Sequence, residues 1–121
     1  MNSGIIALGG GICVVWGLGH LMPTRSIISM FGELSVENRR ILTMEWVAEG
    51  LTLVFLGVLA LLVALAGDGG ATARLVIRAT AVMLVVMAGL TLMTGARTPI
   101  LPMRLCPWVK LTAATLLLIG A

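Results

Sequence analysis

Four long apolar runs constrain this chain more than any other feature. They cover about residues 5–22, 46–66, 75–94 and 102–121, and each has roughly the 20 residues that a helix needs to cross about 30 Å of hydrocarbon. Backbone groups in lipid need hydrogen bonds within the segment, so runs of this length predict helices. The 121 residues therefore predict a single all-α domain, an antiparallel bundle of four transmembrane helices.

The composition indicates the same class of protein. Hydrophobic residues make up 60% of the chain and charged residues 11%, which is typical of an integral membrane protein. The eight Lys and Arg residues are spread over loops and helix ends, and only 4% of residues are aromatic. We therefore expect no nucleic-acid binding. No Lys or Arg precedes the first run and no convincing cleavage site follows it, so we expect a retained span rather than a signal peptide.

The segment from Thr24 to Thr43 differs from the apolar runs because it mixes charged and apolar residues. This pattern predicts a short interfacial or re-entrant helix, followed by a second helix start near Ser35. We expect the segment to lie on the membrane surface as a lid over one end of the bundle. The alternative is an ordinary connecting loop with one helical turn.

Polar residues gather where the first and third runs end and where the second and fourth begin. They are His20, Glu45, Glu49, Arg97, Arg104 and Lys110. In alternating spans these four run ends lie on the same side of the bilayer. Because hydrocarbon disfavours such side chains, we interpret these six residues as a candidate ligand-binding set.

Helix geometry estimates how deep these residues lie. At about 1.5 Å per residue, His20, Glu49 and Arg104 all lie about 23 to 26 Å above the opposite ends of their spans. Lys110 lies deeper in the fourth span, where a Lys costs about 3 kcal/mol on insertion scales. Its nearest expected anions are Glu49 and Glu45; the alternative is that its stem reaches toward the headgroups.

Helical spacing also predicts a pocket wall below the polar level. Cys13 and Trp16 share one face of the first helix with His20, and a Met and Thr stripe follows one face of the third helix. The expected wall residues are Cys13, Trp16, Met83, Met87 and Thr91. Ordinary helix packing is the alternative role for this stripe.

Several kinds of chemistry suit His20, Glu45 and Glu49. They contain the atoms of an acid/base group, and they equally suit ion pairs that fix helix packing. We expect no metal site, because the chain has a single histidine and no Cys-x-x-C pair. The serines have no matching base and acid pattern for a nucleophilic triad.

The end of the first run and the start of the second resemble the DoxX-like group of small four-helix membrane proteins. The matching segments read WGLGHL at 16–21 and EWVAEGLTLVFLG at 45–57, and the resemblance covers about half of the chain. His20 stands where such proteins commonly have a Lys or similar residue, and the segment between the two motifs is longer here. The resemblance implies a four-helix architecture and a membrane redox role, either quinone-linked or in thiol stress.

Three functions follow as hypotheses. The first is binding of a hydrophobic small molecule, a quinone or another isoprenoid lipid, with redox or proton chemistry. Its polar head would contact His20, Glu49 and Arg104, with Glu45 and Arg97 in support. The second is an accessory subunit of a larger membrane complex. The third is a proton-coupled transporter that acts as a homo-oligomer, with Glu49 or Lys110 as the coupling charge.

The distribution of Arg residues predicts the orientation. The polar end has five, Arg25, Arg39, Arg40, Arg97 and Arg104, and the opposite end has Arg74 and Arg78. The positive-inside rule therefore predicts a cytoplasmic polar end, with both termini outside. We expect the protein in the cytoplasmic membrane of a bacterium or archaeon.

Overall fold

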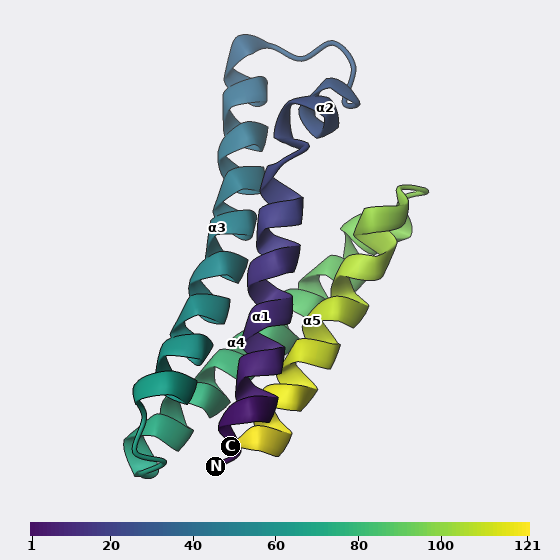
Figure 1. The fold of residues 1–121 in the computed structure, drawn as a ribbon. Helices are drawn as coiled ribbons and strands as arrows, with labels where there is room; N and C mark the ends of the chain where they lie inside the picture. The colour runs from purple at the N-terminus through teal and green to yellow at the C-terminus, as the bar shows by residue number, and fades with distance from the viewer.

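The protein is almost entirely helical. The computed structural model describes residues 1–121, with α1 (Ser3–Leu21), α2 (Thr24–Ser29), α3 (Val36–Ala66), α4 (Ala71–Met93), the 3-10 helix η1 (Gly95–Arg97) and α5 (Leu101–Gly120). Helices α1, α3, α4 and α5 are long and apolar enough to cross a membrane (Figure 1). The predicted all-α class with four spanning helices is confirmed, and the chain is that of an integral membrane protein.

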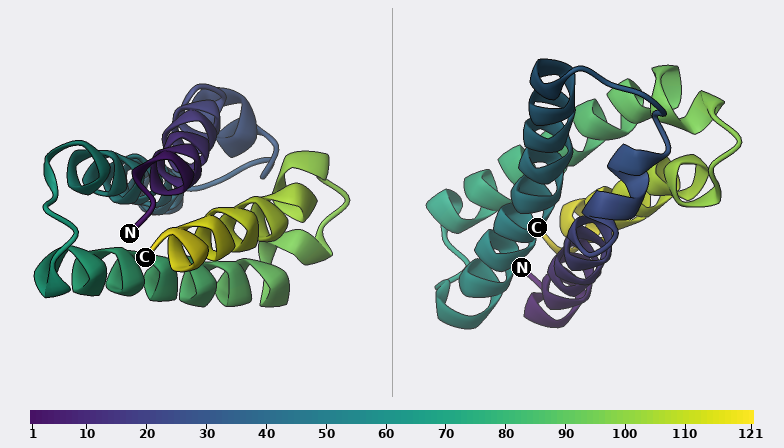
Figure 2. Two further views of the ribbon diagram at one scale, coloured as in Figure 1. Left: turned by 60° about the horizontal axis from the view of Figure 1, so that its bottom comes forward. Right: turned by 90° about the horizontal axis from the view of Figure 1, so that it is seen from above.

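The four long helices form two pairs. α1 packs along α3, α4 packs along α5, and the contact of α1 with α5 joins the pairs. The pairs meet at the end that holds both chain termini and diverge toward the end with α2 (Figures 1 and 2). At the meeting end the backbone N–H of Asn2 donates to the carbonyl of Gly120 over 2.7 Å. We call this the closed end and the opposite one the open end.

Glycines bring α1 and α3 into close contact. A Cβ atom on Gly10 would lie 2.9 Å from the carbonyl oxygen of Gly57, and one on Gly57 would lie 2.6 Å from that of Gly10. Seven residues further along α1, a Cβ on Gly17 would lie 2.9 Å from the backbone nitrogen of Val54. Small residues allow such close approach between membrane helices. Helix α1 therefore packs on α3 with the two backbones almost in contact.

The core and the outer surface are both apolar. Ile6, Leu53, Ile77 and Leu117 are buried where the four long helices meet. Large apolar side chains are also exposed along every long helix, including Val15, Phe55, Leu90 and Ile119. In a membrane these exposed side chains face hydrocarbon rather than water.

The prediction that residues 24–43 form a segment separate from the second span is wrong in extent. α2 is the short helix that was predicted, and Ser35 does begin the next one, with its Oγ accepting a hydrogen bond from the backbone N–H of Asn38 over 3.1 Å. However, residues 36–43 continue without a break into α3, because no Gly or Pro interrupts the chain before Gly50. At 31 residues, α3 is about 45 Å long and exceeds the hydrocarbon thickness. Its first turns extend beyond the bundle, and α2 alone folds back over the open end.

Candidate functional site

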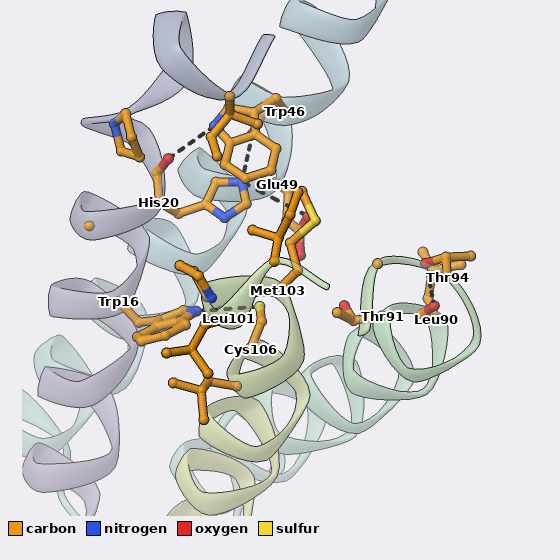
Figure 3. Close-up of a pocket in the computed structure, with 17 residues that line it drawn as sticks. Trp16, His20, Trp46, Glu49, Leu90, Thr91, Thr94, Leu101, Met103 and Cys106 are labelled. Atoms are coloured by element: carbon orange, nitrogen blue, oxygen red, sulfur yellow. Dashed lines mark hydrogen bonds and ion pairs between the residues drawn. The ribbon is translucent and has the colours of Figure 1, made fainter. Parts of the chain in front are cut away.

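A cavity of about 530 Å³ lies at the open end, between the α1–α3 pair and the α4–α5 pair (Figure 3). Its walls are mostly apolar. They include Trp16 from α1, Pro23 and Ile27 around α2, Leu90 from α4, and Leu101 and Leu105 from α5. The two helix pairs diverge toward this end, so the side chains that face each other across the gap are too far apart to fill it.

A buried ion pair lies beside the cavity. Lys110 of α5 is 1% exposed, and its Nζ donates to Glu49 Oε1 of α3 and, over 2.8 Å, to Thr91 Oγ1 of α4. Pairing offsets part of the cost of placing an ammonium group in hydrocarbon. Of the two predicted alternatives for Lys110, the structure has the pair with Glu49. The contact also connects α5 to α4 within its own pair and to α3 of the other pair.

His20 and Trp46 form a reciprocal clamp between the end of α1 and the start of the apolar part of α3. The Trp46 indole N–H donates to the carbonyl of His20 over 3.0 Å, and His20 Nε2 lies 3.1 Å from the carbonyl of Trp46. Because a carbonyl oxygen only accepts, Nε2 carries the proton and donates. The two rings stack with centroids 3.8 Å apart and planes 14° apart. His20 is thereby fixed with Nε2 4.0 Å from Glu49 Oε2.

Trp16 connects α1 to α5 on the other side of the cavity. Its indole N–H donates to the Cys106 sulfur over 3.3 Å. Cys106 and Cys13 are both buried free thiols. The indole ring of Trp16 therefore forms a fixed wall of the cavity (Figure 3).

The structure brings together only some of the predicted ligand-binding residues. His20 and Glu49 line the cavity, and Lys110 lies behind Glu49. Glu45, Arg97 and Arg104 are exposed and do not line it. Depth along a helix does not determine the face of the helix, so residues estimated at one level, such as Arg104 and His20, can point in different directions. A ligand-binding role for these three exposed residues stays a prediction.

The predicted pocket wall is divided in the same way. Trp16 and Thr91 line the cavity. Cys13 and Met87 are instead buried in the core below it, in agreement with the packing alternative, and Met83 is 43% exposed on the outer surface. The cavity is therefore shallower than a pocket that follows the whole Met and Thr stripe.

Most of the cavity residues were not predicted. They include Trp46, the residues Pro23 and Ile27 around α2, and residues 100–103 around the start of α5. Trp46 had a usable signal, because it precedes Glu49 by three residues and so shares its helix face. The other two groups are apolar residues near turns, which no spacing rule marks.

The chain matches no protein-family model, no curated protein and no solved structure. Function therefore has to follow from the geometry of the chain itself.

Proposed function

We propose that this integral membrane protein binds a hydrophobic small molecule, a quinone or another isoprenoid lipid, in the cavity at its open end. The observation that supports this most is an apolar cavity of about 530 Å³ with a polar corner at Glu49 and His20. Ligand sites typically have this size and combine apolar walls with a few fixed polar groups. We also propose that the protein belongs to the DoxX-like group and has a quinone-linked role.

The cavity suggests how such a ligand would lie. Its polar head would sit at Glu49 and His20, which Lys110 and Trp46 hold in place. Its apolar part would lie against Trp16, with Leu90 and Leu105 beyond it. Leu90 is 65% exposed and Leu105 45% exposed, so the cavity is open at these two side chains. A long isoprenoid chain therefore has a continuous apolar path from the cavity to the surrounding lipid.

Proton-coupled transport is the second candidate. The buried pair of Lys110 and Glu49 favours it, because ionisable residues inside the membrane commonly mark ion pathways. In this case Glu49→Gln would abolish proton-coupled flux in reconstituted vesicles while the protein remained folded. Unchanged flux in that variant would exclude Glu49 as the coupling group.

Native mass spectrometry with a cavity-filling variant tests lipid binding. Gly19 lines the cavity, and a Cβ atom there would meet nothing within 4 Å. Gly19→Leu therefore places a side chain at the cavity without a backbone clash. Gly11→Leu is the matched control, since Gly11 lies on the same helix, has equally open surroundings and does not line the cavity.

We expect the wild-type protein and Gly11→Leu to retain a lipid-like molecule after mild extraction, and Gly19→Leu to lose it. Equal occupancy in both variants would place the bound molecule outside the cavity. If the wild-type protein carries no such molecule and always purifies with larger membrane proteins, the accessory-subunit hypothesis replaces this proposal.

A further inference from the structure

We infer that the cavity selects a neutral polar head that donates hydrogen bonds, such as a phenol, a hydroquinone or an alcohol, over a head that only accepts them. The inference rests on the proposed function and narrows its ligand class, because it favours a hydroquinone or an alcohol over an oxidised quinone, whose carbonyl groups only accept. It follows from which polar atoms of the cavity are already hydrogen-bonded within the protein and which are left for a ligand.

The strong side-chain donors at the cavity wall are already used. The indole N–H groups of Trp16 and Trp46 donate to Cys106 and to the His20 carbonyl. The hydroxyl groups of Thr91 and Thr94 donate to backbone carbonyls within α4, at 2.9 and 2.7 Å. His20 Nε2 donates to the Trp46 carbonyl. The thiol of Cys106 is a weak donor. A ligand head that only accepts hydrogen bonds finds no strong free side-chain donor here. The donors left to it are backbone N–H groups in the first turn of α5, which no side chain caps.

The acceptors, in contrast, are partly free. Glu49 uses Oε1 for Lys110, whereas its Oε2 makes no hydrogen bond within the protein and lies 4.0 Å from His20 Nε2. The Glu49 side chain is 33% exposed. Because Nε2 of His20 carries the proton, Nδ1 is an acceptor, and in Figure 3 it points away from Trp46 and Glu49. Two acceptors on cavity-lining residues are thus available to an O–H group.

The charges favour a neutral head. Glu49 is paired with Lys110, so the corner has no net charge to offset a ligand cation. An anionic head would meet the carboxylate oxygen of Glu49 with no free cationic side chain beside it, because Lys110 is buried behind the pair. A neutral hydroxyl avoids both costs and donates to an ionised acceptor, which gives the stronger kind of hydrogen bond.

Matched probes test the inference on the full-length protein in nanodiscs. 4-Decylphenol and 4-decylanisole share ring and chain, but the methoxy group of the anisole cannot donate. n-Decylammonium supplies a charged donor. Binding is measured by isothermal titration calorimetry, and empty nanodiscs correct for partitioning into lipid. We expect the phenol to bind at least about tenfold tighter than the anisole, the ratio that about 1.4 kcal/mol produces.

Two variants assign the preference to its acceptors. Glu49→Gln combined with Lys110→Met removes both charges and leaves no unpaired ion, and His20→Phe keeps an aromatic ring against Trp46 without a ring nitrogen. Each is expected to lower the phenol-to-anisole ratio at least about threefold. Glu37→Gln, which changes an exposed carboxylate on the same helix as Glu49 but outside the cavity, is expected to keep the wild-type ratio. Unchanged affinity for the anisole shows that each variant retains the cavity.

The outcomes separate this inference from the proposed function. If phenol and anisole bind equally and Gly19→Leu blocks both, the selectivity is overturned while lipid binding stands. Tighter binding of the anisole also overturns it and indicates that backbone N–H groups in the first turn of α5 hold the head. Tighter binding of the ammonium overturns the neutral-head requirement. If no probe binds and no lipid is retained on extraction, the proposed function fails as well.

Discussion

The two ends of the bundle hold their helices together by different means. At the closed end glycines bring α1 and α5 close together, since a Cβ atom on Gly9 would lie 3.2 Å from the Ala113 carbonyl oxygen and one on Gly120 would lie 3.2 Å from the Ile6 nitrogen. The backbone hydrogen bond from Asn2 to Gly120 adds to this contact. At the open end bulky and polar side chains keep the helix pairs apart, and single directional contacts bridge them, from Lys110 to Glu49 and from Trp16 to Cys106. Close packing at the closed end holds the four long helices together. The open end can therefore contain a cavity that no side chain fills.

The largest effect is expected from the ion pair of the open end. Lys110→Ala leaves Glu49 without its cation and opens space in a fully packed position. Removing one partner of a fully buried ion pair costs about 3–5 kcal/mol, and we expect a loss of about 3 kcal/mol here because the Glu49 side chain is 33% exposed. The free energy of unfolding, measured by SDS titration in mixed micelles, should fall by that amount.

Arg104→Ala is the matched control for Lys110→Ala. Arg104 lies on the same helix but is exposed, so its removal should change the free energy of unfolding by less than about 0.5 kcal/mol. Glu49→Gln with Lys110→Met should recover much of the loss. If Lys110→Ala behaves like Arg104→Ala, the pair contributes little to the open end.

Two adjacent glycines test the α1–α3 seam, where glycines bring the two backbones together. Gly10→Leu forces a side chain against the Gly57 carbonyl, whereas Gly11→Leu meets open space on the same helix. Overpacking of a tight interface costs about 1–3 kcal/mol. Unfolding in the same micelles should show this loss for Gly10→Leu alone. Equal stability of the two variants would mean that the α1–α3 seam tolerates separation.

The fold was predictable because its main determinants are local. Run length and hydropathy identify four spans, and Ser35 marks the start of α3 by its own capping chemistry. The join between that start and the second span was missed, since a charged stretch such as residues 36–45 is equally compatible with a surface helix. Only the tertiary arrangement decides between the two.

The site was predictable to the level of the helix but not to its face. His20 and Glu49 meet because two spans carry polar residues at similar depth, and Lys110, which is deeper on α5, reaches Glu49 through its long side chain. Arg104 has the right depth and the wrong direction, which depends on how α5 is rotated against α1. The apolar cavity wall had no signal, because leucines that line a cavity and leucines that face lipid look alike in a sequence.

A smaller effect is expected at the clamp between His20 and Trp46. Trp46→Phe keeps an aromatic ring against His20 but removes the N–H that donates to the His20 carbonyl. A hydrogen bond of this kind contributes about 1 kcal/mol. Trp108→Phe is the control, because Trp108 is 61% exposed on the outer surface. A loss in SDS titration for Trp46→Phe, with none for Trp108→Phe, would assign the effect to the clamp rather than to the loss of any indole.

The smallest effect is expected where α3 extends beyond the bundle. Ser35→Ala removes the side chain that caps Asn38, at a cost of about 0.5 kcal/mol for an exposed cap. Hydrogen exchange should accelerate over residues 36–43 and stay unchanged over 50–66, where α1 packs on α3. Ser29→Ala, whose hydroxyl contacts only the nearby Ser26 carbonyl, should leave both stretches unchanged. Faster exchange in the 50–66 stretch of Ser35→Ala would mean that the projecting turns and the glycine seam unfold as one unit, so that the open and closed ends are coupled through α3.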